Sequence, residues 1–180
     1  GDYNVAIGNY AMFSNTTTSS SVAIGHQALY SQNSGQYNVA VGRSALYSLT
    51  SGQYNVGIGN AAMFNNTTGT RNSAFGSQSL YENTTGDYNT ALGHAALYTN
   101  DSGDENSAVG YLALRYNTTG SYNTAMGTGA LEANTTNSYN TAVGYYALAD
   151  DNSGDYNVAV GSYSNFGNQE GTRNVSMGSY

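Results

Sequence analysis

Apolar and polar positions follow a pattern that returns every 17 residues along the whole chain. Most repeats begin with Tyr-Asn, continue with a short apolar segment that closes on glycine, and then carry Ala-Leu-Tyr and an Asn-Thr-Thr-Gly turn or a relative of it. The closing glycine recurs without insertion or deletion, at Gly8, Gly25, Gly42, Gly59, Gly76, Gly93, Gly110, Gly127, Gly144, Gly161 and Gly178. A spacing this constant indicates a structural repeat.

The two apolar segments of each repeat are too short for a helix, which needs about 10 residues, so we expect two short strands joined by turns. In the first strand, the period of two places Tyr, Val and Ile on one face and Asn, Ala and Gly on the other. In the second, Ala and Tyr share a face and Leu points the other way. The Asn-Thr-Thr-Gly corner is expected to use Asn and Gly for left-handed backbone.

Repeats of equal length stack equivalent residues in register. The sequence therefore predicts an all-β fold, a parallel β-solenoid (β-roll) of about ten coils and roughly 48 Å in length. We expect residues 1–180 to form a single repetitive domain and, because the chain opens inside a repeat, to be an excerpt of a longer fibrous protein. The stack is defined by repeated Asn and Gly positions, among them Asn4, Gly8, Asn38, Gly42, Asn55, Gly59, Asn89, Gly93, Asn123, Gly127, Asn140 and Gly144.

Stacking turns equivalent side chains into columns. The Asn column is expected to form an amide ladder in which each side chain bonds its neighbours above and below. The Tyr column should stack its rings, and Arg71 fits between Tyr54 and Tyr88 because a planar guanidinium can lie over an aromatic face. This column is the candidate binding surface and comprises Tyr37, Tyr54, Arg71, Tyr88, Tyr122, Tyr139 and Tyr156.

The burial of apolar groups points to self-association. A coil of this length encloses a thin interior that holds Ala and Leu or Ile in single file, yet both faces of the first strand carry apolar groups. The economical cover for the second face is another copy of the same rod, packed side by side about a shared axis. Periodicity alone leaves open which face looks inward.

Composition narrows the classes of partner. The net charge of −7 comes from 11 acidic residues against 4 arginines, so nucleic acid and anionic membrane surfaces are unfavourable partners. No apolar run is long enough to span a bilayer, so we expect no membrane insertion in this segment. The chain has no Cys, which excludes disulfides and thiolate metal sites, and its 18 Tyr residues argue against disorder.

Candidate chemistry is sparse, because a regular repeat places like residues in columns whereas an enzyme needs unlike residues at one place. The sequence contains no Gly-x-Ser-x-Gly, His-Glu-x-x-His, P-loop or dinucleotide motif. His26 and His94 occupy the same repeat position four coils apart, roughly 19 Å, which is too far to share a metal ion. We therefore predict surface histidines, no catalytic residues and no cofactor.

Acidic residues leave calcium binding open as a weaker possibility. Like charges repel when they lie one coil apart, as Asp87 and Asp104 would, and a cation could relieve this. The candidate ligands are Asp87, Asp101, Asp104, Asp150, Asp151 and Asp155. The alternative is that these are solvated corner residues that keep the rod soluble.

Four corners also spell N-glycosylation sequons, at Asn66, Asn83, Asn117 and Asn134. Their regular recurrence is better explained by turn chemistry, in which Asn and Thr side chains bond the local backbone.

The coil sequences resemble those of a known family. The segments 21–25, 72–76 and 106–110, which read Ser-Val-Ala-Ile-Gly, Asn-Ser-Ala-Phe-Gly and Asn-Ser-Ala-Val-Gly, resemble coils of the YadA-like heads of trimeric autotransporter adhesins. Residues 140–148 also resemble repeats in the tail fibres of phages and contractile injection systems. The resemblance implies a left-handed β-roll, a homotrimer, and an extracellular place on a cell surface, virion or injection-system fibre. The coil here is a few residues longer than the family's and carries the extra Ala-Leu-Tyr element.

These observations favour a structural and adhesive module that is not an enzyme. It would project a repetitive surface toward a host-cell glycan or protein receptor, with many weak contacts adding up through multivalency. One alternative is an ice-binding β-solenoid, because a threonine column recurs at Thr16, Thr50, Thr67, Thr84, Thr118 and Thr135 but is broken at Asn33, Asp101 and Asn152. The other is a fibre with a glycan-depolymerase site, which predicts an acidic cluster in a groove between subunits.

Overall fold

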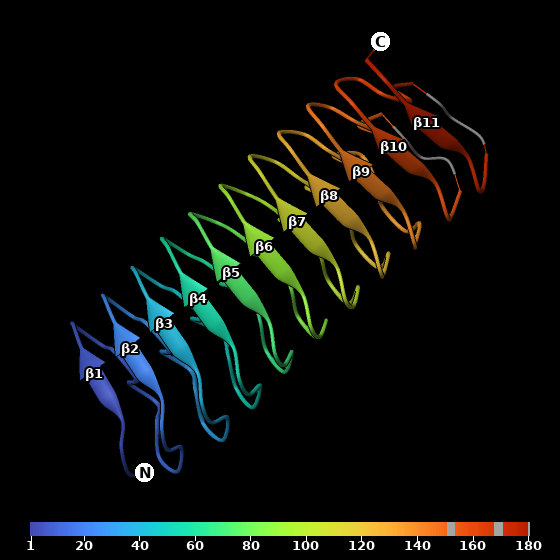
Figure 1. The fold of residues 1–180 in the computed structure, drawn as a ribbon. Coiled ribbons are helices and arrows are strands. Elements are labelled where there is room, and N and C mark those ends of the chain that lie inside the picture. The colour runs from blue at the N-terminus through green and yellow to red at the C-terminus, as the bar shows by residue number, and fades with distance from the viewer. Residues whose placement is uncertain (151–153, 168–170, 180) are drawn as a thin grey trace.

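The computed structural model describes residues 1–150, 154–167 and 171–179. Over these ranges the chain is a β-solenoid of about ten turns and contains no helix (Figure 1). Each turn contributes one three-residue strand to a single sheet, in the order of the sequence. The strands are β1 (Val5–Ile7), β2 (Val22–Ile24), β3 (Val39–Val41), β4 (Val56–Ile58), β5 (Ser73–Phe75), β6 (Thr90–Leu92), β7 (Ser107–Val109), β8 (Thr124–Met126), β9 (Thr141–Val143), β10 (Val158–Val160) and β11 (Val175–Met177).

All neighbouring strands pair in parallel with a constant offset of one repeat. Val5 pairs with Val22 at one end of the sheet, and Val158 pairs with Val175 at the other. Equal coil length is the cause, because an inserted residue would shift every later pair out of register. The predicted all-β parallel solenoid is therefore confirmed.

The strand faces also follow the prediction. The middle residue of each inner strand points inward and is fully buried, as at Ala23 and Ala108, while the flanking Val and Ile positions point outward. The leading tyrosine lies outside the strand, however. Its backbone is left-handed, with φ of 59° at Tyr37, and this turns the chain into the strand.

The Ala-Leu-Tyr segment is not a strand, so the predicted second strand is wrong. Its central residue has left-handed backbone in successive coils, with φ of 51° at Leu46 and 52° at Leu97. Ala96 and Leu97 are both fully buried, whereas an extended chain would have placed them on opposite faces. Left-handed backbone costs about 1–2 kcal/mol in a residue with a side chain, and burial of leucine together with the Leu97 N–H bond to Ala113 O (3.0 Å) offsets that cost.

The interior is a file of Ala and Leu side chains with buried Asn at its borders. The predicted Ala and Leu columns are present, but the Ile positions face outward. The amide–amide bonds expected in the first Asn column occur from Asn55 Nδ2 to Asn38 Oδ1 (3.2 Å) and from Asn174 Nδ2 to Asn157 Oδ1 (3.1 Å), but the recurring bonds of this column take a different form. There, Asn38 Oδ1 accepts the backbone N–H of Asn55 (2.9 Å), and Asn38 Nδ2 donates to Gly52 O (2.9 Å). This column therefore ties the strand to the corner of its own coil and to the next coil.

A side-chain amide ladder does form, in the corner column. Asn100 Nδ2 donates to Asn83 Oδ1 and Asn117 Nδ2 donates to Asn100 Oδ1, both at 2.7 Å. Each Nδ2 also bonds a corner carbonyl, as Asn100 does with Gly103 O (2.9 Å). All these side chains are buried, so each bond replaces one lost to water.

Most corner glycines have a different role from the one expected, although Gly154 does have left-handed backbone, with φ of 37°. The corner Gly86 lies outside the left-handed region, and a Cβ there would approach Gly103 O to 2.5 Å, so close stacking of coils requires glycine. The closing glycine of the strand has both constraints. At Gly76 φ is 139°, and a Cβ would lie 2.5 Å from Gly93 O.

Candidate functional site

The predicted Tyr column is present and exposed, and it runs across the sheet just before the N-terminal ends of the strands. The rings of Tyr122 and Tyr139 stack with centroids 4.8 Å apart and planes inclined by 5°. The Arg71 guanidinium lies 5.5 Å from the Tyr54 ring and 5.2 Å from the Tyr88 ring, and its Nη1 donates to Tyr88 Oη at 2.7 Å. The rings are about half exposed, so the column is a regular aromatic surface.

One acidic residue interrupts this column. Glu105 stands where Tyr or Arg stands in neighbouring coils. Its negative charge, with a smaller contribution from the Tyr139 phenol, raises the pKa of Tyr122 above the ordinary value. The column thus has a local negative point between Tyr88 and Tyr122.

The outer face of the sheet carries exposed apolar side chains along the whole rod. The last residue of each strand is Ile, Val, Phe, Leu or Met, and these residues include Ile58, Phe75, Leu92 and Met126. Leu92 and Met126 are each 47% exposed to solvent. The first strand residue is Val in β1–β4, Ser or Thr in β5–β9, and Val again in β10–β11. The sheet face is therefore most apolar toward its ends.

A second aromatic column lies on the opposite side of the Leu file and was not foreseen as a stack. Its rings follow one another at 4.9–5.3 Å with planes within 10° of parallel, and they are Phe13, Tyr30, Tyr47, Phe64, Tyr81 and Tyr98. The stack ends at Arg115, which forms an ion pair with Glu132 (3.7 Å) in the next coil. The recurring third position of Ala-Leu-Tyr is the sequence signal that could have revealed it.

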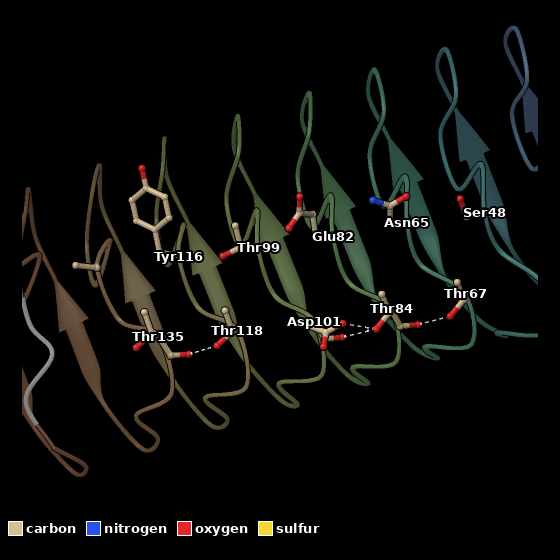
Figure 2. A pocket seen from close by; sticks show the side chains of 11 residues that line it. Ser48, Asn65, Thr67, Glu82, Thr84, Thr99, Asp101, Tyr116, Thr118 and Thr135 are labelled. Carbon is tan, nitrogen blue, oxygen red and sulfur yellow. Dashed lines mark hydrogen bonds between the residues drawn. The ribbon is translucent and has the colours of Figure 1, made fainter.

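A trough with a volume of about 860 Å³ runs along the rod beside this second column. Figure 2 shows its two rows of side chains, each with one residue per coil. The upper row comes from the position after the aromatic column, and the lower row comes from the threonine column. The lining residues are Ser48, Asn65, Thr67, Glu82, Thr84, Thr99, Asp101, Tyr116, Thr118, Ala133 and Thr135.

Threonine hydroxyls in the lower row are engaged with the backbone. Thr67 Oγ1 donates to Thr84 O (2.9 Å), and Thr118 Oγ1 donates to Thr135 O (3.0 Å). Thr84 Oγ1 bonds both the carbonyl and the carboxylate of Asp101 (Figure 2). The hydrogen atom of each of these hydroxyls is already used in a hydrogen bond, so the threonines present acceptor lone pairs and methyl groups to the trough.

The acidic residues proposed as calcium ligands mostly serve as acceptors between coils. Asp104 Oδ1 accepts the Asp87 N–H (2.8 Å), and Asp87 Oδ1 accepts the Thr70 N–H (2.7 Å). Asp155 Oδ1 does the same for Ser138 (2.8 Å).

The remaining calcium candidates are dispersed. Asp101 lies in the trough, Asp150 lines a smaller hollow beside Tyr146 and Tyr163, and Asp151 lies outside the described residues. In the part of the chain that the structure describes, no three His, Cys, Asp or Glu residues are grouped as a metal site would require. Calcium binding therefore stays a prediction.

The histidines and the sequon asparagines differ sharply in accessibility. His26 and His94 are exposed as predicted, and the His94 ring stacks on Tyr111 at 5.6 Å. The sequon asparagines Asn66, Asn83, Asn117 and Asn134 are buried members of the amide ladder. A glycan can be attached to such a nitrogen only when the corner opens.

Comparisons with known proteins leave the site to be interpreted on its own geometry. No family model matches the chain, and no curated protein or solved structure is significantly similar to it. Among the described residues, no helix has the length and apolar character needed to cross a membrane.

Proposed function

We propose that this chain is a rod segment of an extracellular, non-enzymatic fibre or adhesin head that holds a repetitive binding surface away from a cell or particle. The observation that carries the proposal is the in-register stacking of β1 to β11, which repeats each exposed column at one constant spacing. A rod of this kind suits projection and multivalent contact. Its interior is filled by packed Ala and Leu side chains.

Self-association, most simply as a homotrimer, supplies the cover for the outer sheet face. A continuous row of exposed Ile, Val, Phe, Leu and Met side chains is unusual on a surface that faces only water. Because every coil contributes one such residue, identical chains can align these rows along their whole length. The few charges on this face make dry contact between copies favourable.

The mass of the native particle tests this assembly. We expect a multiple of the chain mass, and we expect Leu92→Glu to shift the particle toward single chains because it places a charge in the apolar row. Ser102→Glu is the matched control, since Ser102 is exposed in a corner away from the sheet face. A folded single chain without substitution would contradict the assembly.

Attachment is assigned to the Tyr column, because exposed rings with amide and hydroxyl neighbours suit glycan and protein surfaces. We expect the intact protein to be retained on whole cells or on a glycan array. The double variant Tyr122→Ser, Tyr139→Ser should reduce retention, whereas Tyr30→Ser, Tyr47→Ser removes an equally stacked pair from the other column. Equal retention by the two variants would remove the Tyr column from the binding surface.

Glycan cleavage is the second candidate, because Glu82 and Asp101 both line the trough and glycosidases use paired carboxylates. Incubation with a polysaccharide that the protein retains, followed by size chromatography, separates the two candidates. A non-enzymatic fibre leaves the chain length unchanged, and progressive shortening that Glu82→Gln abolishes would establish the depolymerase.

A further inference from the structure

We propose that the trough between the second aromatic column and the threonine column binds a linear, uncharged glycan that lies parallel to the rod axis. The inference rests on the proposed adhesive function and gives it a ligand class and a second surface. It does not involve the Tyr column.

The trough is elongated and repetitive. It draws on six successive coils, from Ser48 to Ala133, and each coil adds one residue to its upper row. A linear polymer can therefore meet an equivalent environment at every step, whereas a compact ligand would use a fraction of the available length.

The period of the trough disfavours an extended peptide. Neighbouring coils are about 4.8 Å apart. An extended peptide returns a side chain to the same face only after about 6.7 Å, so it would drift out of step with the coils.

Backbone pairing also argues against a peptide. The N–H groups of both rows already bond the next coil, as Glu82 N does with Tyr98 O (2.9 Å) and Thr84 N with Asp101 O (2.9 Å). No strand can be added at this surface, because β-augmentation needs free backbone groups. Recognition must come from side chains.

The side chains offer what a sugar ring requires. The Asn65 amide and the Glu82 carboxylate make no hydrogen bond or ion pair with other described residues, so both are available to sugar hydroxyls. The threonine methyl groups present an apolar surface to the C–H faces of the rings. Tyr116 lies one coil before the end of the upper row with a half-exposed ring, and the Arg115 guanidinium lies 4.7 Å from its centroid and helps to hold it in place.

Charge excludes the anionic glycans. The trough is lined by Glu82 and Asp101 and by no Arg, Lys or His, and the whole chain carries a net charge of −7. A sulfated or uronic-acid polymer would meet two carboxylates without a counter-charge. An uncharged chain meets hydrogen-bond acceptors in the same place.

Calorimetric titration of the intact protein with a length series of cello-oligosaccharides tests the proposal. We expect affinity to rise with each added ring until about six rings, where the trough ends, and then to level off. An oligogalacturonate of the same length should not bind. Affinity that is independent of length, or preference for the anionic series, would overturn the proposal.

Two variants localise the binding. Tyr116→Ala should weaken the longest bound oligosaccharide by about tenfold, as expected for the loss of one stacking ring. Tyr111→Ala is the matched control, because Tyr111 is an exposed ring of the same repeat that does not line the trough. Asn65→Ala and Asn60→Ala form a second pair, in which Asn60 is exposed outside the trough.

The outcomes separate this proposal from the adhesive function. If cells or arrays retain the protein, but no cello-oligosaccharide binds or Tyr116→Ala binds like Tyr111→Ala, the trough assignment fails and adhesion stands. If oligosaccharides bind with the expected length dependence and loss in Tyr116→Ala, the trough assignment holds even where the Tyr-column variants retain full attachment to cells.

Discussion

The flank that carries the second aromatic column divides into two halves that share one interior. From Phe13 to Tyr98 the column is an unbroken stack of six rings. Beyond Tyr98 the same position holds Arg115, Glu132 and Ala149, and the ring stack gives way to an ion pair. The buried Ala and Leu columns continue through both halves, with Met63 and Ser79 as replacements in the first half and Ser164-Asn165 at their end in the second.

This difference shows which residues specify the fold. Because buried Ala and Leu positions continue on both sides of Tyr98, the solenoid does not depend on the aromatic stack. The residue types in the outer columns can therefore change from one coil to the next. Such changes place unlike side chains next to one another on the surface of the rod. In the irregular half, which follows Tyr98, the Tyr146 ring packs against Gly129, where any added Cβ would lie 2.5 Å from the ring. A hollow lies beside Tyr163 in the same half.

The largest expected effect is the loss of an interior leucine. Leu97→Ala in the regular half and Leu131→Ala in the irregular half should each lower the free energy of unfolding by about 2–5 kcal/mol, since both side chains are fully buried. Chemical denaturation measures both. A loss confined to Leu97 would mean that the two halves do not share one continuous interior.

Features of the fold and of the site could be predicted from the sequence where they follow from the constant repeat length. They could not be predicted where they follow from turn geometry. Constant length gives the register, the parallel sheet and the stacking of Arg71 between Tyr54 and Tyr88, and all three were predicted. The left-handed backbone at Leu97 could not be predicted, because leucine disfavours it and only burial and inter-coil bonding maintain it. The trough depends on where such turns aim their side chains, so periodicity gave no sign of it.

The closing glycine tests whether coil stacking or backbone conformation is the stricter constraint. Gly76→Ala should lower the free energy of unfolding by about 1–3 kcal/mol from strained backbone, and by more from the approach to Gly93 O. Gly178→Ala provides the comparison, because Gly178 has φ of 125° but no atom within 4 Å of an added Cβ. We expect Gly178→Ala to show the smaller loss in denaturant titration. Equal losses would leave no role for the stacking distance.

A smaller effect is expected from the aromatic stack itself. Tyr47→Ala removes a ring that stacks at 4.9 Å on Tyr30 and 5.0 Å on Phe64, and should reduce the free energy of unfolding by about 1–3 kcal/mol. Glu132→Ala, at the same repeat position in the irregular half, removes only a partly exposed ion pair and should change it by less than about 1 kcal/mol. Equal losses would contradict the view that the two halves differ in how their flank is stabilised.

The smallest effect concerns the titration of the Tyr column. Glu105 raises the pKa of Tyr122, so Glu105→Gln should lower that pKa toward its ordinary value, as followed by the ultraviolet absorbance of tyrosinate. A raised pKa in the folded chain contributes stability at pH values below the unfolded pKa, and that contribution disappears as the pH rises through the folded value. Removing the carboxylate should therefore extend stability at alkaline pH. Glu132→Gln makes the matching change beside Tyr146, where the same carboxylate repulsion is the main cause of a raised pKa. If both variants lower the pKa of their own tyrosine alone, the two flanks titrate independently, as expected for columns separated by an apolar interior.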